Sequence, residues 1–336
     1  MSAPISYVIA SVLFLALATG GGRDPASSTH GMLVVANQGD HTALLIDPRT
    51  RQELMKVTVG VNGHEVAVSP DSRFAYVPIY GNSGVGKPGT DGHAIDVIDL
   101  RERKLVATIE LGKPLRPHRA DFGPDGLLYV SAELDHALDV IDPATRKVLA
   151  EIPTGAAESH MFVISHDGSR AYTANVGPGS VSVLDLKTRS LITVIPVAKT
   201  VQRISITPDD KRVFTHDQDN PRIAVIDTAT NKVATWIQLP ATVYSSSPTP
   251  DGHKLLAASP SGKLFIIDLA SYKLEGSFDI PPASGELLIT PDGKFAFISC
   301  PQVGVIEVFD VRGDKLLEPI KLTRGVDGLA WASAIP

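Results

Sequence analysis

The sequence predicts an all-β fold, a seven-bladed β-propeller with four antiparallel strands per blade. Two repeated patterns and the match between the chain ends lead to this prediction. The first pattern is an apolar run that ends in Asp and a turn, as in DVIDPAT and SVLDLKT. A unit of about 42 residues is typical of a propeller blade. Its seven Asp residues are spaced by 52, 43, 43, 42, 41 and 42 positions: Asp47, Asp99, Asp142, Asp185, Asp227, Asp268 and Asp310.

The second pattern is a turn of the type Pro-Asp-Gly that lies out of phase with the first. It occurs six times, and each copy precedes a β-type run such as FAYVPIY or LLYVSAE. Each unit therefore reads strand, turn, strand, loop, strand, turn, strand. We interpret the repeated Asp residues as scaffold rather than catalytic groups, because Asp holds a turn by accepting hydrogen bonds from nearby amides.

The two chain ends together supply the blade that otherwise lacks a turn. The C-terminal GVDGLAWASAIP aligns with GVNGHEVAVSPD and stops where the turn would begin, whereas HGMLVVANQGD starts with the strand that would follow. We therefore expect the N- and C-terminal strands to pair in one blade and close the ring, which removes the open sheet edge. The units are too short to fold alone, so residues 30–334 are expected to form a single domain.

The repeat unit resembles the YVTN-type β-propeller repeat, which runs roughly N-x-V-x-V-I-D-x-x-T, then a Ser-Pro-Asp-Gly turn, then Y-V-T-N. The nearest local match is Tyr172-Thr173-Ala174-Asn175. The resemblance covers about residues 30–334 and implies the propeller fold. Propellers of this kind include exported binding proteins and lactonase-like enzymes, and related ones occur in haem- and copper-dependent oxidoreductases, so the resemblance leaves the function open.

Composition and the N-terminus indicate an exported protein that does not bind nucleic acid. The formal net charge is −6, and no cluster of Lys and Arg forms the basic stripe that nucleic-acid binding needs. Residues 1–22 contain an apolar run from Tyr7 to Ala18, too short for a membrane span, which predicts a cleaved signal peptide or, since no basic residue precedes it, an N-terminal anchor. We expect a periplasmic or secreted protein with no membrane span after cleavage. The single cysteine, Cys300, cannot form an internal disulfide and is expected to be packed or in a loop.

Histidines gather where the blades differ, on the face opposite the repeated turns. An inner set stands seven residues before a turn Asp, at the start of three successive innermost strands: His64, His118 and His160. Because innermost strands converge on the central channel, these imidazoles are candidates for a three-His site that holds a divalent metal ion. Gln202 occupies the same place in the next blade and is a candidate fourth ligand. A solvated channel lined by polar side chains is the alternative interpretation.

An outer set of histidines stands six residues before the blade Asp. His41, His93 and His136 are candidates for a general base or for substrate contact, with loop surface as the alternative. Asp40 and Asp135 precede outer histidines and Glu65 follows the inner His64, so these carboxylates could orient imidazole rings.

Four other residues near the inner histidines are candidates for substrate binding. Arg116, Arg119 and Arg203 could bind a carboxylate or sulfate group, and Tyr244 holds the inner position of its blade. A Gly-rich stretch from Tyr80 to His93 accounts for the longest Asp spacing and suits either a lid over the channel mouth or a plain surface insertion.

Two functional hypotheses follow. The first is a metal-dependent lyase or hydrolase that acts on a small polar or anionic molecule, with a metal on the inner histidines and an outer histidine such as His136 as base. The second is a non-catalytic propeller that binds a ligand, a metal for delivery or a cell-envelope partner. No Gly-x-Ser-x-Gly elbow, phosphate loop, dinucleotide fingerprint or Cys-x-x-Cys-His haem motif is present in the sequence.

Overall fold

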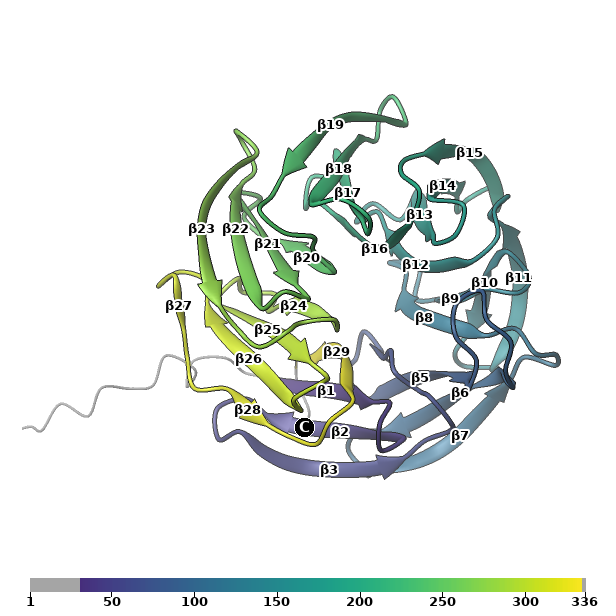
Figure 1. The fold of residues 1–336 in the computed structure, drawn as a ribbon. Helices are drawn as coiled ribbons and strands as arrows, with labels where there is room; N and C mark the ends of the chain where they lie inside the picture. Colours follow the sequence, from purple (N-terminus) through teal and green to yellow (C-terminus); the bar gives the residue numbers. More distant parts are fainter. Residues whose placement is uncertain (1–30, 334–336) are drawn as a thin grey trace, which may run out of the picture.

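The computed structural model describes residues 31–333, and these form a ring of seven β-sheets around a central axis (Figure 1). The predicted seven-bladed propeller is confirmed. The N-terminal segment, residues 1–22, lies outside the described residues. Within residues 31–333, no helix has the length and apolar character needed to cross a membrane.

Each blade has four main strands, and successive strands along the chain run from the channel to the rim. From the channel outward, blades 1 to 4 contain β29 (Val326–Ala332), β1 (Met32–Asn37), β2 (Thr42–Asp47) and β3 (Gln52–Thr58); β4 (Ala67–Val68), β5 (Phe74–Gly81), β6 (Asp91–Asp99) and β7 (Lys104–Glu110); β8 (Pro117–Phe122), β9 (Leu128–Ala132), β10 (Ala137–Asp142) and β11 (Lys147–Pro153); and β12 (Ser159–Ile164), β13 (Arg170–Asn175), β14 (Ser180–Asp185) and β15 (Ser190–Pro196).

The remaining three blades follow the same plan. They contain β16 (Val201–Ile206), β17 (Arg212–Asp217), β18 (Arg222–Asp227) and β19 (Lys232–Gln238); β20 (Ser245–Pro248), β21 (Lys254–Ser259), β22 (Lys263–Asp268) and β23 (Lys273–Asp279); and β24 (Leu287–Ile289), β25 (Phe295–Cys300), β26 (Val305–Asp310), with the short β27 (Lys315–Leu316) and β28 (Ile320–Lys321) sharing the outer edge.

The two ends of the chain close the ring in blade 1, as the sequence predicts. β29 pairs antiparallel with β1, with Met32 opposite Ala332 and Val34 opposite Ala330. Trp331 stacks on Phe297 of blade 7, with ring planes 20° apart. Figure 1 shows this junction, where the yellow β29 lies beside the purple β1. The pairing satisfies the backbone groups of both terminal strands.

The apolar core lies between neighbouring blades rather than at one centre. Because side chains alternate along a strand, each sheet presents apolar residues to both of its neighbours. Val34 and Leu45 of blade 1 pack with Ala75 and Val77 of blade 2, for example, and the described residues contain seven such clusters. The thiol of Cys300 is buried here, and burial raises its pKa to about 12, so it is a packed thiol.

The repeated Asp residues hold turns. Oδ1 of Asp99 accepts hydrogen bonds from the amides of Arg101 and Glu102, at 3.0 and 2.9 Å. In the other series, Oδ1 of Asp167 accepts from the amide of Ser169 at 2.8 Å. These contacts fit the scaffold interpretation, since they use the carboxylates within their own turns.

The loop between β5 and β6 is shorter than the Gly-rich stretch from Tyr80 to His93 that the sequence indicated, because both ends of that stretch belong to strands. Tyr80 and Gly81 complete β5, and residues from Asp91 onward belong to β6, so both strands extend beyond the usual blade length. The connecting loop is residues 82–90, closed at its base by hydrogen bonds between Asn82 and Thr90. The chain bends at Gly81, just before this loop, and the φ of 88° at this position lies in the left-handed region that favours glycine.

Candidate functional site

A cavity of about 540 Å³ occupies the mouth of the channel on the face opposite the repeated turns. Equivalent positions of six blades supply side chains to it because their innermost segments all point toward the axis. These residues, in blade order from blade 1, are Asp327, His64, His118, His160, Gln202 and Tyr244. The cavity is therefore where the sequence places the inner histidines.

His118 contacts both of the other inner histidines. The Nε2 atoms of His64 and His118 lie 2.7 Å apart, and the ring centroids of His118 and His160 lie 3.5 Å apart. Tyr80 stands against all three rings, at centroid distances of 5.6, 5.4 and 6.3 Å. The structure thus brings together the three histidines that the sequence grouped by spacing.

Contacts behind two of the rings set which nitrogen faces the cavity. Nδ1 of His64 donates to the carbonyl oxygen of Asn62 at 3.0 Å, which leaves its Nε2 to accept a hydrogen bond or bind a ligand. Nδ1 of His160 faces Oε2 of Glu133 at 3.4 Å, and its Nε2 faces the amide nitrogen of Gln202 at 3.5 Å. A carbonyl or carboxylate behind the ring is the arrangement that orients metal-ligating histidines.

Burial keeps the first two imidazoles neutral. It lowers the pKa of His64, and it lowers the pKa of His118 well below the usual value, with further lowering from the neighbouring His160 and His64. The neutral form is the one that binds metals. Nδ1 of His118 is buried with no hydrogen-bond partner, and so is Nδ1 of His160, whose contact with Glu133 is an ion-pair distance of 3.4 Å.

Three imidazole nitrogens are ligands that suit a transition metal ion. The Nε2 atoms of His64 and His118, however, lie closer together than two nitrogens bound to one metal ion. Two nitrogens bound to one tetrahedral Zn²⁺ lie about 3.4 Å apart, so His64 and His118 would separate by about 0.7 Å. Among residues 31–333, no group of three or more His, Cys, Asp or Glu side chains is already arranged around a metal position. His64, His118 and His160 would hold the ion, with Gln202 beside them.

A layer of buried and half-buried charges lies next to the histidines. Its members Glu65, Arg119, Arg203 and Glu286 each lie one residue further along their innermost segments, and Asp327 joins them from the cavity position of blade 1. Arg203 pairs with Glu286, with Glu65 at 2.9 Å and with Asp327 at 3.3 Å. Arg119 pairs with Glu286 at 3.2 Å and Glu65 at 3.5 Å. Three carboxylates, of which Glu65 and Asp327 are buried and Glu286 is half-buried, thus lie against two guanidiniums. The layer carries no surplus positive charge with which to attract an anion.

The pKa values of these carboxyl groups reflect their burial and the excess of carboxylates over guanidiniums. Burial, together with the nearby Glu65 and Glu286, raises the pKa of Asp327 to about 8 against the lowering effect of Arg203. Burial likewise raises the pKa of Glu286, whereas Arg203 and Arg119 overcome burial at Glu65 and lower its pKa. Asp327 also accepts a hydrogen bond from Gln38 at 2.9 Å and lines the cavity. It is the cavity carboxyl that exchanges a proton near neutral pH.

The arginines predicted to bind substrate already have protein partners. Arg119 and Arg203 belong to the charge layer, and Arg203 alone of the two lines the cavity. Arg116 donates to Asp91, Glu133 and two loop carbonyls. The ring of Tyr244 lies over Arg203 at 5.1 Å, and its hydroxyl accepts from Gln202 at 3.0 Å. Of the four candidates, Arg203 and Tyr244 reach the cavity.

The outer histidines do not line the cavity. His93 is exposed and pairs with Glu110 at 2.9 Å, His136 is exposed, and Nδ1 of His41 accepts from the amide of Asn62 at 3.2 Å. His41 and His136 have φ values of 52° and 50°. His is among the side chains that tolerate this left-handed conformation, which gives these two residues a role in the loop backbone.

The carboxylates expected to orient imidazoles have other partners. Asp40 pairs with Lys56 at 3.0 Å, and Asp135 pairs with Lys113. Glu65 pairs with the two arginines of the charge layer. Glu133, two residues before Asp135, faces His160 instead.

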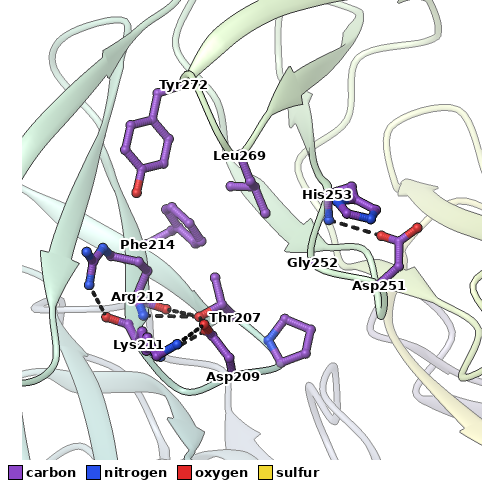
Figure 2. Close-up of a pocket in the computed structure, with 11 residues that line it drawn as sticks. Thr207, Asp209, Lys211, Arg212, Phe214, Asp251, Gly252, His253, Leu269 and Tyr272 are labelled. Carbon is purple, nitrogen blue, oxygen red and sulfur yellow. Dashed lines mark hydrogen bonds and ion pairs between the residues drawn. The ribbon is translucent and has the colours of Figure 1, made fainter.

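A second cavity, of about 350 Å³, lies on the opposite face between blades 5 and 6 (Figure 2). Figure 2 shows that its polar groups serve the repeated turns: Asp209 holds Thr207 and the backbone of Lys211, and Asp251 accepts from the amide of His253. We assign no chemistry to it, because these contacts repeat the scaffold pattern of the other blades.

Comparisons with known proteins support the fold. No family model and no curated protein matches the chain. Among solved structures, a chain of hydrazine synthase from Kuenenia stuttgartiensis is similar, with a TM-score of 0.67 and 19% identity. The match covers 86% of this chain and 92% of that chain. At this identity the likeness shows the propeller fold alone, and kinship with YVTN-type repeat proteins stays a prediction.

Sequence reasoning missed three residues of the site. In the sequence, Tyr80 is only the first residue of the Gly-rich stretch. Asp135, next to His136, is a more obvious partner for an imidazole than Glu133. Asp327 was missed because the alignment of the chain ends places Leu329 at the position of His64. Leu329 instead packs in the core with Leu33 and Phe297. A search for acidic as well as imidazole side chains two residues earlier would have found Asp327.

Proposed function

We propose that the channel-mouth cavity binds a divalent transition-metal ion through His64, His118 and His160 and a small polar molecule beside it. The observation that carries this proposal is the convergence of three imidazoles from three blades, with contacts behind His64 and His160 that leave their Nε2 atoms facing inward. Chance contact of solvated channel residues would not require such contacts behind the rings.

The proposed chemistry is of the lyase or hydrolase type. A bound metal there supplies Lewis-acid chemistry to a carbonyl group or to a water molecule. The protein's own residues would position the substrate, with Gln202, Tyr244 and Gln302 offering hydrogen-bonding groups at the cavity wall. Asp327 is the proposed proton donor or acceptor, in place of the outer histidines, since it lines the cavity and they do not.

The arginines near the cavity are already paired with carboxylates, and this affects which charge a substrate should carry. A neutral polar molecule suits the cavity without the metal, because Arg203 is already surrounded by carboxylates. An anionic substrate, as the sequence led us to expect, would need the charge of the metal ion.

A non-catalytic function is the second candidate. It is favoured by the position of His41, His93 and His136, which leaves the cavity without the histidine base that the sequence predicted. In this case the cavity would hold a ligand, or a metal for delivery, without turnover. Export to the cell envelope belongs to both candidates and rests on residues 1–22.

Metal analysis of protein without a His-tag tests the proposal. The metal content of the purified protein is measured, and Zn²⁺, Co²⁺ and Mn²⁺ are titrated into wild type and into the His64→Ala, His118→Ala, His160→Ala triple variant. The matched control replaces His41, His93 and His136 with Asn, which also accepts positive φ at two of these positions.

The expected result is one tight site in wild type and in the control, and none in the inner triple variant with its fold intact by circular dichroism. Equal binding by the inner triple variant would refute the metal site. Turnover in panels of lactones, glycosides and uronates then separates the candidates: activity that needs the inner histidines supports an enzyme, and tight metal binding without turnover supports the binding protein.

A further inference from the structure

The loop of residues 82–90 is fastened over the cavity by one buried arginine. Nη2 of Arg116 donates to the carbonyl of Lys87 at 2.7 Å, and Nη1 donates to the carbonyl of Gly84 at 3.1 Å. Its Nε donates to Asp91, at the end of the loop, at 2.6 Å. Arg116 is 6% exposed and comes from blade 3, whereas the loop belongs to blade 2. The arginine therefore ties the loop to the next blade.

The fastened loop forms part of the cavity wall. Ser83, Gly84 and Val85 line the cavity beside the histidines. The loop also reaches blade 4, where a Cβ on Gly86 would lie 2.8 Å from Oε1 of Glu158. The loop thus contacts blades 3 and 4, which carry His118 and His160, and forms part of the cavity wall beside them.

Glu133 joins this fastening to the histidine cluster. Its Oε1 accepts from Nη1 of Arg116 at 3.2 Å. Its Oε2 accepts from the hydroxyl of Tyr80 at 2.6 Å and faces Nδ1 of His160 at 3.4 Å. Glu133 is 1% exposed, so each of these contacts is shielded from water. Both oxygens of one carboxylate are therefore used, one toward the loop and one toward the imidazoles.

We propose that Glu133 is a positioning residue that couples closure of the 82–90 loop, through Arg116, to the orientation of His160. When the loop is fastened, Arg116 holds Glu133 in place, and the carboxylate charge 3.4 Å from Nδ1 of His160 favours the proton on that nitrogen, with Nε2 toward the cavity. When the loop opens and Arg116 leaves, Glu133 loses its fixed position and His160 loses its support. This inference rests on the proposed metal site for only one of its three readouts.

Two substitutions test the coupling from its two ends. Glu133→Gln keeps the shape but supplies one acceptor oxygen, so it cannot accept on both sides. Arg116→Lys keeps the charge but loses the fork that reaches Asp91 and the loop carbonyls together. Glu133 contacts both Arg116 and His160, so a matching response of His160 to the two substitutions is expected if the coupling passes through this carboxylate. Glu110→Gln is the matched control, since Glu110 pairs with exposed His93 on the same face.

Three measurements follow. Hydrogen exchange reports loop opening at the bonded amides of Asn82, Lys87 and Thr90. Long-range ¹H–¹⁵N spectra of metal-free protein, assigned by loss of one signal set in His160→Ala, report which ring nitrogen carries the proton. Titration with Co²⁺ reports metal affinity.

We expect both variants to raise loop exchange at least about tenfold, to shift His160 away from the Nδ1–H form, and to weaken Co²⁺ binding roughly 10- to 100-fold. The control should change none of these. Faster loop exchange in Arg116→Lys with an unchanged His160 spectrum would overturn the coupling, and so would an unchanged loop. If wild type binds no metal, the proposed function fails, while the exchange and tautomer measurements still decide the coupling.

Discussion

The Nε2 atoms of His64 and His118 lie 2.7 Å apart although 54 positions separate the two residues in the chain. They come from the innermost segments of blades 2 and 3, which the propeller geometry brings to the same depth in the channel. The contact between them is a hydrogen bond from one neutral imidazole to the other. Charged side chains and the 82–90 loop both lie close to this pair.

The charge layer predicts an asymmetric response to substitution. Arg203→Met leaves Glu65, Glu286 and Asp327 with one guanidinium between them, and we expect a loss of about 3–5 kcal/mol in the free energy of unfolding. Asp327→Asn removes a carboxyl that burial already disfavours in its charged form, so it should be tolerated. Urea denaturation measures both, with the exposed Arg312→Met as control. A mild effect of Arg203→Met would show that the layer is not held by this residue.

The substitution Asp139→Asn is expected to stabilise the protein more at high pH than at low pH. This residue is 1% exposed and lies opposite Glu151 in the sheet, and burial together with Glu151 raises its pKa to about 7. The group therefore stabilises the fold in its protonated form below about pH 4, and that contribution is lost as pH rises through 7. Asp139→Asn mimics the protonated form, so it should stabilise the protein at pH 8, by at most about 4 kcal/mol.

The control for this prediction is Asp185→Asn. Turn amides and the Thr188 hydroxyl lower the pKa of Asp185, so its contribution is present above its unfolded pKa and is lost as pH falls. Thermal unfolding should show that the stabilisation by Asp139→Asn is larger at pH 8 than at pH 5. The effect of Asp185→Asn should be the same at both pH values, because both lie above the unfolded pKa of Asp185. A stabilisation by Asp139→Asn that is equal at both pH values would contradict the assignment.

Ring closure predicts that the last strand is essential. A chain that ends at Gly325 lacks β29, which leaves the edge of β1 unpaired and removes the stacking of Trp331 on Phe297. We expect aggregation or a large fall in melting temperature, because an open strand edge pairs with other chains. Light scattering and calorimetry measure this. A stable monomer of that truncated chain would show that the β1–β29 pairing contributes little.

The buried thiol should be unreactive in the folded protein. Cys300 is fully buried, and burial raises its pKa to about 12, so almost no thiolate exists near neutral pH. Reaction with a thiol reagent such as DTNB should follow global unfolding and accelerate in urea together with the loss of circular dichroism. Fast labelling under native conditions would point to local opening of blade 7.

Much of the fold was predictable because repeats constrain it directly. The Asp spacing gave the number of blades, and the unmatched chain ends gave the closing pair. The three inner histidines were also predictable, since their offset from each turn Asp fixes their place on an innermost strand. Asp327 was not, because the pairing of β29 with β1 has an irregularity between Val35 and Asn37, next to the point where the aligned motif begins.

Sequence alone determined the ring of seven blades, its closure and the arc of histidines, because strand periodicity and repeat spacing are local properties of the chain. Only the tertiary structure decided which polar groups meet. Arg116 contacts the 82–90 loop, Glu133 rather than Asp135 faces an imidazole, and Asp327 lines the cavity. Such partnerships depend on distance across the channel and on burial, which strengthens each contact by excluding water, and neither quantity is encoded in the spacing of residues along one strand.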